Sequence, residues 1–356
     1  MEPLSPCYAT ARVAFLDAAE QATARVESFV HPGRGLDGVE LAVDVAEVGP
    51  ASNDRVVIVV SGTHGVEGYL GSALQRHHLA QLAAAPHASD QPTLILVHGL
   101  NPFGFSWLRR VNEDNVDLNR NFIDWENPPT NESYRDLATA LVPAGWTAED
   151  QEQSFAALMA ELERVGMPAF QQTVSGGQYD YPDGIFYGGS KPVWSHRWAR
   201  DFFGRRLDGV AHAAVIDLHT GLGPWGFGEL ISSAMPNSET YRRQGDWYGA
   251  VTAHKGEGSV SAPLLGDWLT AVPGMSPSTE VTAVAIEYGT VDVVTVLQSL
   301  RADAVLHAHG DPTAPEAKVI RDQVRAAFND DDPAWLDACW PRYESVTRTA
   351  MTRVGR

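Results

Sequence analysis

The chain has 356 residues, of which 44% are hydrophobic and 20% are charged, and its formal net charge is −19. This composition is typical of a globular protein with a sizeable core. The negative charge argues against nucleic acid or an anionic membrane as a partner, because either would need clustered Lys and Arg.

The first six residues lack the basic start and the continuous apolar stretch of a signal peptide. No apolar run approaches the roughly 18 residues of a membrane span. Cys7 and Cys339 are the only cysteines, so neither a disulfide framework nor a thiolate zinc site is predicted. We expect a cytoplasmic protein.

Helix and strand signals alternate along the first part of the chain. Apolar residues recur at helical spacing over residues 9–29. Two apolar runs, residues 39–45 and 56–60, predict strands around a polar turn. A helix is expected at residues 69–82, and a buried strand at residues 93–97. This alternation is typical of an α/β fold with a largely parallel sheet.

A Gly- and Tyr-rich segment, residues 175–189, interrupts the pattern. We expect it to be a loop insertion that lines a pocket, although a plain surface loop is an equal alternative. Further helices are predicted at residues 134–141, 152–165, 193–207 and 238–253 and near the C-terminus, and further strands at residues 213–218, 229–232 and 281–286. The sequence therefore predicts a single α/β domain over residues 1–356, with a central mixed, mostly parallel sheet flanked by helices.

The motif H-G-V-E, from His64 to Glu67, directly follows a predicted strand and precedes a helix. In open α/β sheets ligands bind beyond the carboxyl ends of the strands, so an imidazole and a carboxylate stand where a site is expected. Gly62, Gly65 and Gly68 permit the tight turn that would aim both side chains at one point. A solvated turn with ordinary polar residues is the alternative.

The pattern H-x-x-[DE] is weak by itself, and it occurs twice more in the chain. His87 and Asp90 lie in a polar loop, and His254 and Glu257 lead from a helix into a glycine-rich turn. Neither pair follows a buried strand, so the context selects His64.

A second histidine, His219, ends the predicted strand at residues 213–218, and Asp217 points to the same face two residues earlier. Asp217 could therefore orient His219 or balance its charge. Imidazole with carboxylate suits zinc, and three protein ligands with an open fourth position define a catalytic site. We expect one zinc ion per chain, held by His64, Glu67 and His219.

The stretch G-L-G-P-W-G at residues 221–226 matches the letters of a dinucleotide fingerprint. Pro224 removes an amide that could bind phosphate, and the next residues indicate a strand where the fingerprint requires a helix. We therefore expect a tight connection beside the metal and no nucleotide.

Three motifs after the H-x-x-E pattern resemble those of the M14 zinc carboxypeptidase family in sequence and in order. They are N-P-F-G at residues 101–104, R-V-N at residues 110–112 and V-D-L-N-R-N at residues 116–121. With a later D-L-H and a glutamate at the end of a strand, the resemblance spans about residues 56–290. The sequences G-T-H-G-V-E-G and D-L-H-T-G-L-G look closest to those of the DUF2817 branch. The resemblance implies a zinc carboxypeptidase-like fold.

The resemblance also implies a role for each motif. The metal ligands would be the three residues named above, and Arg110 would polarise the scissile carbonyl. Asn119 and Arg120 would bind a substrate carboxylate, and Glu287 would be the general base. Arg suits these roles because its planar fork binds carboxylates and its charge stabilises a developing oxyanion. Surface arginines in a solvated loop are the alternative.

Glu287 ends a predicted strand that is otherwise free of charge. Its carboxylate must therefore be exposed at a sheet edge or held in a site. A general base at this position needs a pKa tuned towards neutrality by its surroundings. A capping acid before Gly289 is the alternative.

These residues predict a zinc-dependent hydrolase that cleaves an amide bond next to a substrate carboxylate, as a carboxypeptidase does, with Glu287 activating the water. The substrate would be a small peptide, or an N-acyl amino acid if the protein is a deacylase similar to aspartoacylase and succinylglutamate desuccinylase. A non-catalytic module that binds zinc or a carboxylate is the third reading. The chain has no G-x-S-x-G and no H-E-x-x-H motif, which disfavours a serine esterase and a zincin. No motif fixes which tyrosine, if any, faces the substrate.

Overall fold

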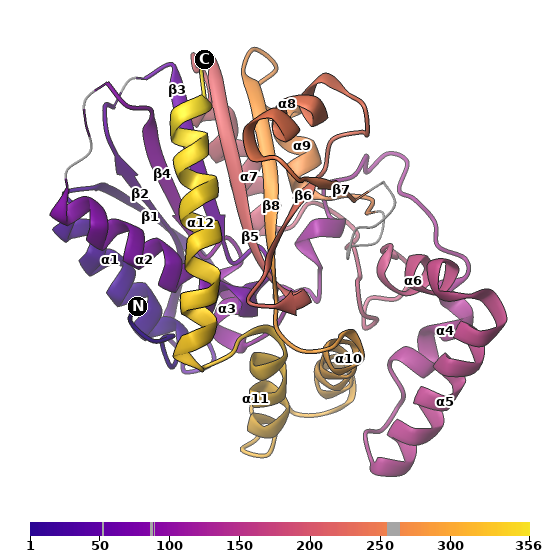
Figure 1. Cartoon of the computed structure of the whole chain (residues 1–356). Coiled ribbons are helices and arrows are strands. Elements are labelled where there is room, and N and C mark those ends of the chain that lie inside the picture. Colours follow the sequence, from indigo (N-terminus) through magenta and orange to yellow (C-terminus); the bar gives the residue numbers. More distant parts are fainter. Residues whose placement is uncertain (52, 86–87, 89, 255–263) are drawn as a thin grey trace.

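A mixed β-sheet runs through the centre of the computed structural model (Figure 1), which describes residues 1–51, 53–85, 88, 90–254 and 264–356. Within these residues the sheet has eight strands in the order β1-β2-β4-β3-β5-β8-β6-β7. The strands are β1 (Arg25–Arg34), β2 (Glu40–Val48), β3 (Arg55–Ser61), β4 (Thr93–His98), β5 (His212–Trp225), β6 (Gly228–Ser232), β7 (Thr252–Ala253) and β8 (Glu280–Gly289).

The four central strands, β4, β3, β5 and β8, are mutually parallel, whereas β1, β2 and β6 run antiparallel to their inner neighbours. Strands β3 and β4 are almost completely buried, as expected for parallel strands that are covered on both faces. The fold-class prediction of a mixed, mostly parallel sheet is confirmed. Parallel pairing also brings the carboxyl ends of β3, β5 and β8 to one edge of the sheet.

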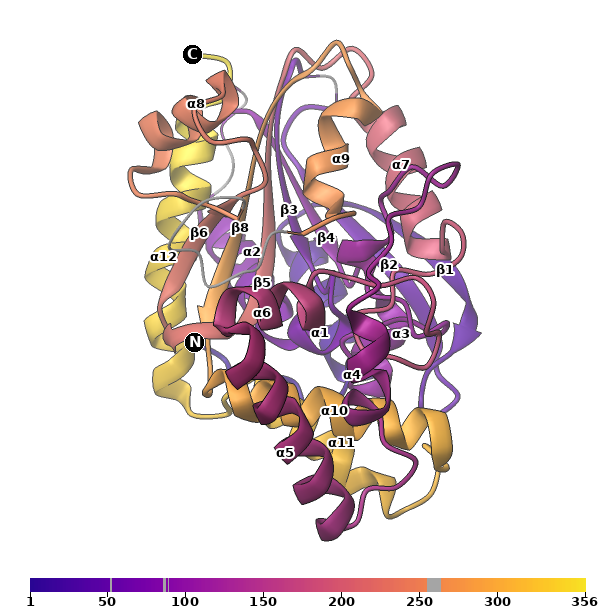
Figure 2. The same ribbon diagram turned by 90° about the vertical axis from the view of Figure 1, so that its right-hand side faces the viewer.

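Helices cover both faces of the sheet, and alternate residues of each strand supply the two cores. Val57 and Val59 of β3 belong to the core under one helical layer, and Val56 and Ile58 to the core under the other. The first layer consists of α1 (Tyr8–Gln21), α2 (Gly68–Ala84) and α12 (Pro333–Arg353), and the second contains α7 (Trp194–Arg206) and α9 (Trp268–Met275). Figure 2 shows α12 and α7 on opposite sides of the strands.

The remaining helices lie outside these two layers. An arm of three helices stands to the side of the sheet in Figure 1 and has its own small apolar core. The arm consists of α4 (Tyr134–Leu141), α5 (Ala148–Val165) and α6 (Met167–Ser175), and the other elements are α3 (Pro102–Trp107), α8 (Glu239–Tyr248), α10 (Val293–His309), α11 (Ala317–Phe328) and the short 3-10 helices η1 (Gly65–Glu67) and η2 (Leu118–Arg120). Among the described residues no helix combines the length and the apolar character needed to cross a bilayer.

The predicted helix over residues 9–29 is wrong in its second half, because α1 ends at Gln21 and β1 begins at Arg25. Thr23 between them has a φ of 52°, which breaks the helix and turns the chain into the sheet. β1 is an edge strand with mostly exposed side chains, so it lacks a clear alternation of apolar and polar residues. The predicted helix at residues 238–253 is also too long, since α8 ends at Tyr248 and β7 follows it.

We expect Thr23→Gly to raise the free energy of unfolding by roughly 0.5–1 kcal/mol, because a left-handed φ is unfavourable for a β-branched residue and free for glycine. Urea denaturation measures the change. The control is Ala22→Gly, whose φ of −78° is ordinary, and this variant should be destabilised. A Thr23→Gly protein that is no more stable than the wild type would contradict the argument.

Candidate metal centre and active site

The residues expected in the site converge on the carboxyl edge of the parallel strands. His219 and Glu287 are direct partners in the β5–β8 register. β3 lies on the other side of β5 and ends at Ser61, three residues before His64. The strand order therefore places His64 and Glu287 on either side of His219.

A tight turn carries His64 and Glu67 into this edge. Gly62 has a φ of 69°, which favours glycine. Gly65 starts η1, where a Cβ atom would lie 2.0 Å from the carbonyl carbon of Gly104. Only a glycine lets η1 lie backbone to backbone against α3, and the Val66 amide donates to the Arg109 carbonyl at 2.9 Å across this contact.

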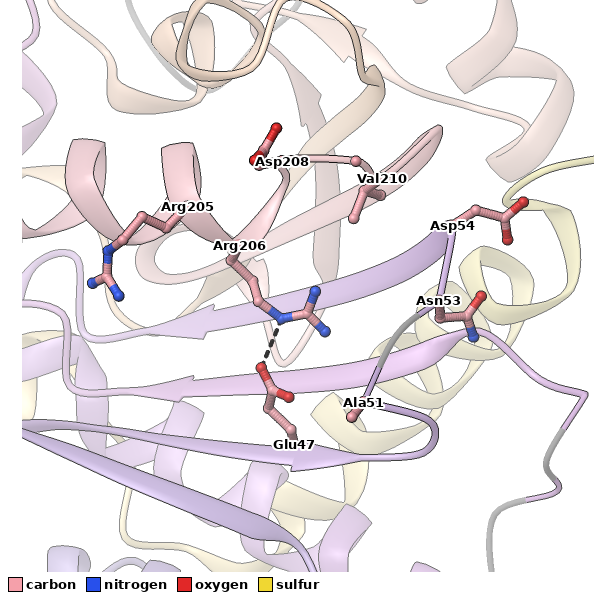
Figure 3. A pocket seen from close by; sticks show the side chains of 9 residues that line it. Glu47, Ala51, Asn53, Asp54, Arg205, Arg206, Asp208 and Val210 are labelled. Atoms are coloured by element: carbon pink, nitrogen blue, oxygen red, sulfur yellow. Dashed lines mark hydrogen bonds and ion pairs between the residues drawn. The ribbon is translucent and has the colours of Figure 1, made fainter.

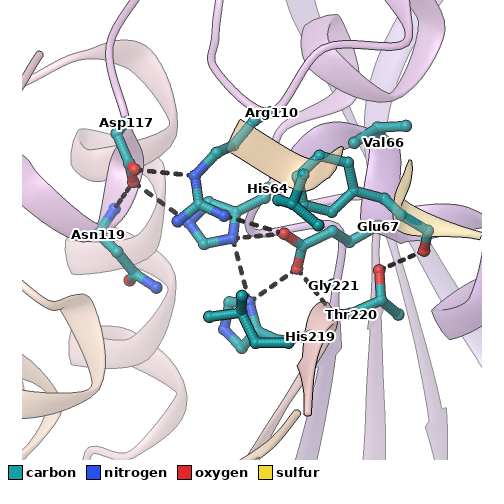
Figure 4. A network of polar contacts seen from close by, with 12 residues as sticks. His64, Val66, Glu67, Arg110, Asp117, Asn119, His219, Thr220 and Gly221 are labelled. Atoms are coloured by element: carbon teal, nitrogen blue, oxygen red, sulfur yellow. Dashed lines mark hydrogen bonds and ion pairs between the residues drawn. The ribbon is translucent and has the colours of Figure 1, made fainter. Parts of the chain in front are cut away.

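The ligand groups of three side chains meet at the centre of the site (Figure 4). The Nδ1 atoms of His64 and His219 lie 3.2 Å apart. Each of them also lies 2.9 Å from an oxygen of Glu67, Oε1 for His64 and Oε2 for His219. Among the described residues this is the one group of three His, Cys, Asp or Glu side chains whose ligand atoms come within 4.8 Å of one another.

This geometry fits a tetrahedral metal. Bonds of about 2.0–2.1 Å to zinc place two tetrahedral ligands about 3.3 Å apart, which is close to the observed separation of the imidazole nitrogens. His64 and His219 are 3% and 5% exposed and Glu67 is 1% exposed, so the donors are shielded from water. The three residues could hold one divalent cation, with a further position open to a ligand.

A carboxylate holds the second ring nitrogen of each histidine. His64 Nε2 lies 3.2 Å from Asp117 Oδ1, and His219 Nε2 lies 2.6 Å from Asp217 Oδ2. A proton on each Nε2 leaves the lone pair of Nδ1 for a metal, as in carboxylate–histidine–metal arrangements. Asp217 has the orientation expected from the sequence. Asp117 was not singled out as a functional residue, although it lies inside the V-D-L-N-R-N block.

Arg110 lies between the acids of the site. Its Nε donates to Asp117 Oδ2 at 3.0 Å, and its Nη1 donates to Glu67 Oε1 at 3.2 Å. Burial disfavours the charged guanidinium, but Asp117 and Glu67 outweigh that effect and raise the pKa of Arg110. Burial likewise opposes the ionised form of Glu67, yet His64 and His219 hold its pKa well below the usual range.

Asn119 and Arg120 belong to η2, whose N-cap is Asp117. The amide oxygen of Asn119 accepts the backbone N–H of Trp268 at 3.4 Å, an orientation that leaves its NH₂ group for other acceptors. Arg120 is 2% exposed, and its Nη2 and Nε donate to the Ser175 carbonyl at 2.5 and 3.1 Å. The pair predicted to bind a carboxylate thus lies next to Asp117 and Trp268.

The loop at residues 175–189 packs on the two arginines. Phe186 has a φ of 55°, and its ring centroid lies 5.4 Å from Arg110 Cζ and 5.3 Å from Arg120 Cζ. The hydroxyl of Tyr179 donates to the Arg120 carbonyl at 2.6 Å. An aromatic face stabilises the two cations without neutralising them, as a carboxylate would. The role of this loop in lining a substrate pocket stays a prediction.

Glu287 is partly buried beside the metal donors. Its Oε1 accepts the Leu222 N–H at 3.0 Å, from a bulge in β5 where the register with β8 shifts. Burial and the charge of Glu67 raise the pKa of Glu287 to about 7, against the lowering effect of His219 and the Leu222 amide. A carboxyl group with such a pKa is suited to accept and return a proton near neutrality.

A cavity of about 610 Å³ lies at the opposite edge of the sheet (Figure 3). It opens between the end of α7 and the start of β3, and Arg206 Nε pairs there with Glu47 Oε1 at 2.7 Å. No histidine of the described residues lines it. The chemistry-bearing groups therefore lie elsewhere. Of the two rejected H-x-x-[DE] matches, His87 and Glu257 lie outside the described residues.

Comparisons with known proteins place the chain among relatives. The family model described as "Protein of unknown function (DUF2817)" matches residues 4–342. No curated protein matches the sequence. Among solved structures, thrombin activatable fibrinolysis inhibitor aligns at 12% identity over 90% of this chain and 74% of its own, with a TM-score of 0.49. Carboxypeptidase A from Helicoverpa armigera aligns at 13% identity over 98% of this chain and 74% of its own, with a TM-score of 0.47. An aspartoacylase family protein from Mesorhizobium loti aligns at 17% identity over 75% and 61%, with a TM-score of 0.39.

We expect Gly65→Ala to lower the free energy of unfolding by about 1–3 kcal/mol, because the new methyl group would overlap the backbone of α3. Urea denaturation measures this loss, and the metal content should fall with it because η1 carries Glu67. The control is Gly245→Ala in α8, where a Cβ meets open space and alanine favours the helix. Equal stability of the two variants would refute the close approach.

We expect Glu287→Gln to stabilise the metal-free protein at pH 8.5 and to leave it almost unchanged at pH 4. The folded-state pKa of about 7 lies above the ordinary value of 4.5, so the stability of the neutral carboxyl is fully present below pH 4.5 and is lost as the pH rises from there through 7. The gain has an upper limit of about 3 kcal/mol. Thermal denaturation across this pH range measures it, and a pH-independent difference would contradict the raised pKa.

Proposed function

The chain belongs to the DUF2817 family, as its motifs predict, and we propose that it is a zinc-dependent hydrolase that cleaves an amide bond next to a substrate carboxylate. One observation carries the proposal. The Nδ1 atoms of His64 and His219 converge with the Glu67 carboxylate at metal-ligand spacing, while Asp117 and Asp217 hold their Nε2 atoms. Such a buried donor set suits a catalytic cation.

The protein groups around the donors supply the acid–base chemistry. A zinc ion at this site would act as a Lewis acid on the substrate carbonyl and lower the pKa of water. Glu287 would take the proton of the attacking water and return it to the leaving amine, since burial raises the pKa of its carboxyl towards neutrality. The Leu222 N–H fixes one of its oxygens and so orients the carboxylate.

Arg110 would stabilise the negative charge that develops on the carbonyl oxygen. Asp117 and Glu67 bind its Nε and Nη1, and the remaining N–H groups of the guanidinium can donate to the substrate. Because two carboxylates already fix its position, little reorganisation is needed when the charge appears.

Asn119 and Arg120 support a substrate with a free carboxylate. The Asn119 oxygen faces the Trp268 N–H, so the group that it offers to a substrate is a donor. Arg120 adds a positive charge beside it. Both are 6% exposed or less, which favours a small substrate over a folded protein.

Two kinds of small substrate satisfy these groups. A short peptide with its C-terminal carboxylate gives a carboxypeptidase, which the resemblance to M14 zinc carboxypeptidases supports. An N-acyl amino acid gives a deacylase, for which the buried position of Asn119 and Arg120 is equally suitable. A binding module without turnover would need neither Glu287 nor Arg110 in these positions.

Metal content tests the proposal first. We expect about one zinc per chain in the purified wild type by elemental mass spectrometry, and a loss of zinc in His64→Ala and His219→Ala. The matched control is His212→Ala, because His212 lies at the other end of β5, where its Nδ1 lies 3.3 Å from Glu280 Oε1. Wild-type protein that takes up no divalent metal, even on reconstitution, would refute the proposed function.

A panel of dipeptides and N-acyl amino acids, with and without the free carboxylate, then identifies the substrate. Glu287→Gln should keep the metal and lose turnover by roughly 10²–10⁴-fold, the usual contribution of a general base. Unchanged ligand binding and no turnover in either protein would instead indicate a binding module.

A further inference from the structure

Trp268 is the first residue of α9 and is fully buried. Its side chain and its backbone each donate a hydrogen bond to a residue of the site. The two acceptors, Asp217 and Asn119, belong to different halves of that site, the metal centre and the carboxylate-binding pair. No motif of the sequence pointed to this residue.

The indole N–H reaches the metal centre through Asp217. Trp268 Nε1 donates to Asp217 Oδ2 at 2.7 Å, and the same oxygen lies 2.6 Å from His219 Nε2. The other oxygen, Oδ1, accepts the hydroxyl of Thr63 at 2.8 Å. Asp217 is 0% exposed, so these partners rather than water set the plane of its carboxylate.

The segment that carries Trp268 is itself fixed on η2. The backbone N–H of Trp268 donates to Asn119 Oδ1 at 3.4 Å. Gly266 approaches the chain so closely that a Cβ atom would lie 2.5 Å from the Arg120 carbonyl oxygen, and its own carbonyl accepts the Phe122 N–H at 3.1 Å. Trp268 therefore has little freedom to move relative to the pair at Asn119 and Arg120.

We propose that Trp268 is a positioning residue of the active site. Its indole N–H sets Asp217 and, through Asp217, the ring of His219, whereas its backbone N–H sets the amide of Asn119. This inference rests on the proposed function. It predicts that the side chain of Trp268 governs metal affinity, and that its backbone governs the orientation of the carboxylate-binding amide.

A purely structural role is the competing explanation, because Trp268 also packs against Phe203 in the core. Trp335 is the matched control. It is likewise 0% exposed and donates its indole N–H at 3.0 Å, but to the backbone carbonyl of Gly289. Trp268→Phe and Trp335→Phe thus remove similar volumes and one hydrogen bond each.

The experiment measures zinc affinity by competition with a chelator, next to the thermal stability of the metal-free proteins. We expect Trp268→Phe to weaken zinc binding at least 10-fold, within the range found for outer partners of metal ligands. Trp335→Phe should change the affinity less than 3-fold at a similar loss of stability. Equal affinities in the two variants would overturn the proposal.

A double-mutant cycle tests the route through Asp217. If Trp268 acts through this carboxylate, Trp268→Phe should have little further effect on zinc affinity in an Asp217→Asn background. Additive effects of the two substitutions would show that they act independently and would overturn the proposed route.

The kinetic constants separate the effect of the indole N–H of Trp268 from that of its backbone N–H. Phenylalanine keeps the backbone N–H that binds Asn119, so Trp268→Phe with saturating zinc should lower kcat and leave KM for a carboxylate substrate within about 2-fold. A rise in KM with unchanged kcat would contradict the assignment.

The outcomes also separate the proposed function from the proposed role of Trp268. A wild type that binds no metal refutes the proposed function and this inference with it, whereas a zinc-binding wild type with an unaffected Trp268→Phe variant refutes this inference alone.

Discussion

One buried carboxylate, that of Asp117, holds together the part of the site that lies outside strands β5 and β8. It is 0% exposed and accepts hydrogen bonds from His64 Nε2, from Arg110 Nε and from the backbone N–H of Asn119. The predicted metal ligand His64, the predicted oxyanion-binding Arg110 and the predicted carboxylate-binding Asn119 are therefore tied to the same two oxygens. Burial opposes its charge, but Arg110 and Arg120 hold the pKa of Asp117 well below its usual range. Asp117 therefore stays ionised at any physiological pH, and the hydrogen bonds that it accepts are kept.

The two halves of the site differ in how they are supported. His219, Asp217 and Glu287 lie on strands β5 and β8, whose parallel pairing fixes their spacing. Arg110 lies on irregular backbone and Arg120 lies at the end of η2, and their positions depend on contacts with the loop at residues 175–189 and with the segment before α9. The sheet therefore positions His219, Asp217 and Glu287, while the predicted substrate groups rest on segments that can vary in length and sequence.

Local sequence patterns revealed the parts of this site that stand at strand ends. Buried apolar runs ending in His64, His219 and Glu287 could be recognised because strand ends in a parallel sheet share one edge. β1 and α9 escaped recognition for local reasons, since β1 is an exposed edge strand and α9 is short and contains Pro273. The contacts of Trp268 escaped because they join residues 51 and 149 positions apart, and no local pattern records such pairs.

Electrostatics link the metal centre to the predicted base. Burial and the negative charge of Glu67 are what raise the pKa of Glu287 towards 7. A cation held by Glu67 would offset that repulsion, because it would neutralise the charge of the carboxylate that binds it. Glu287 would then be ionised at neutral pH and able to take a proton. Arg110 acts in the same direction, because its guanidinium lies 3.2 Å from Glu67 Oε1 and already offsets part of the Glu67 charge. The ionisation of the predicted base thus depends on the charge at the predicted metal site.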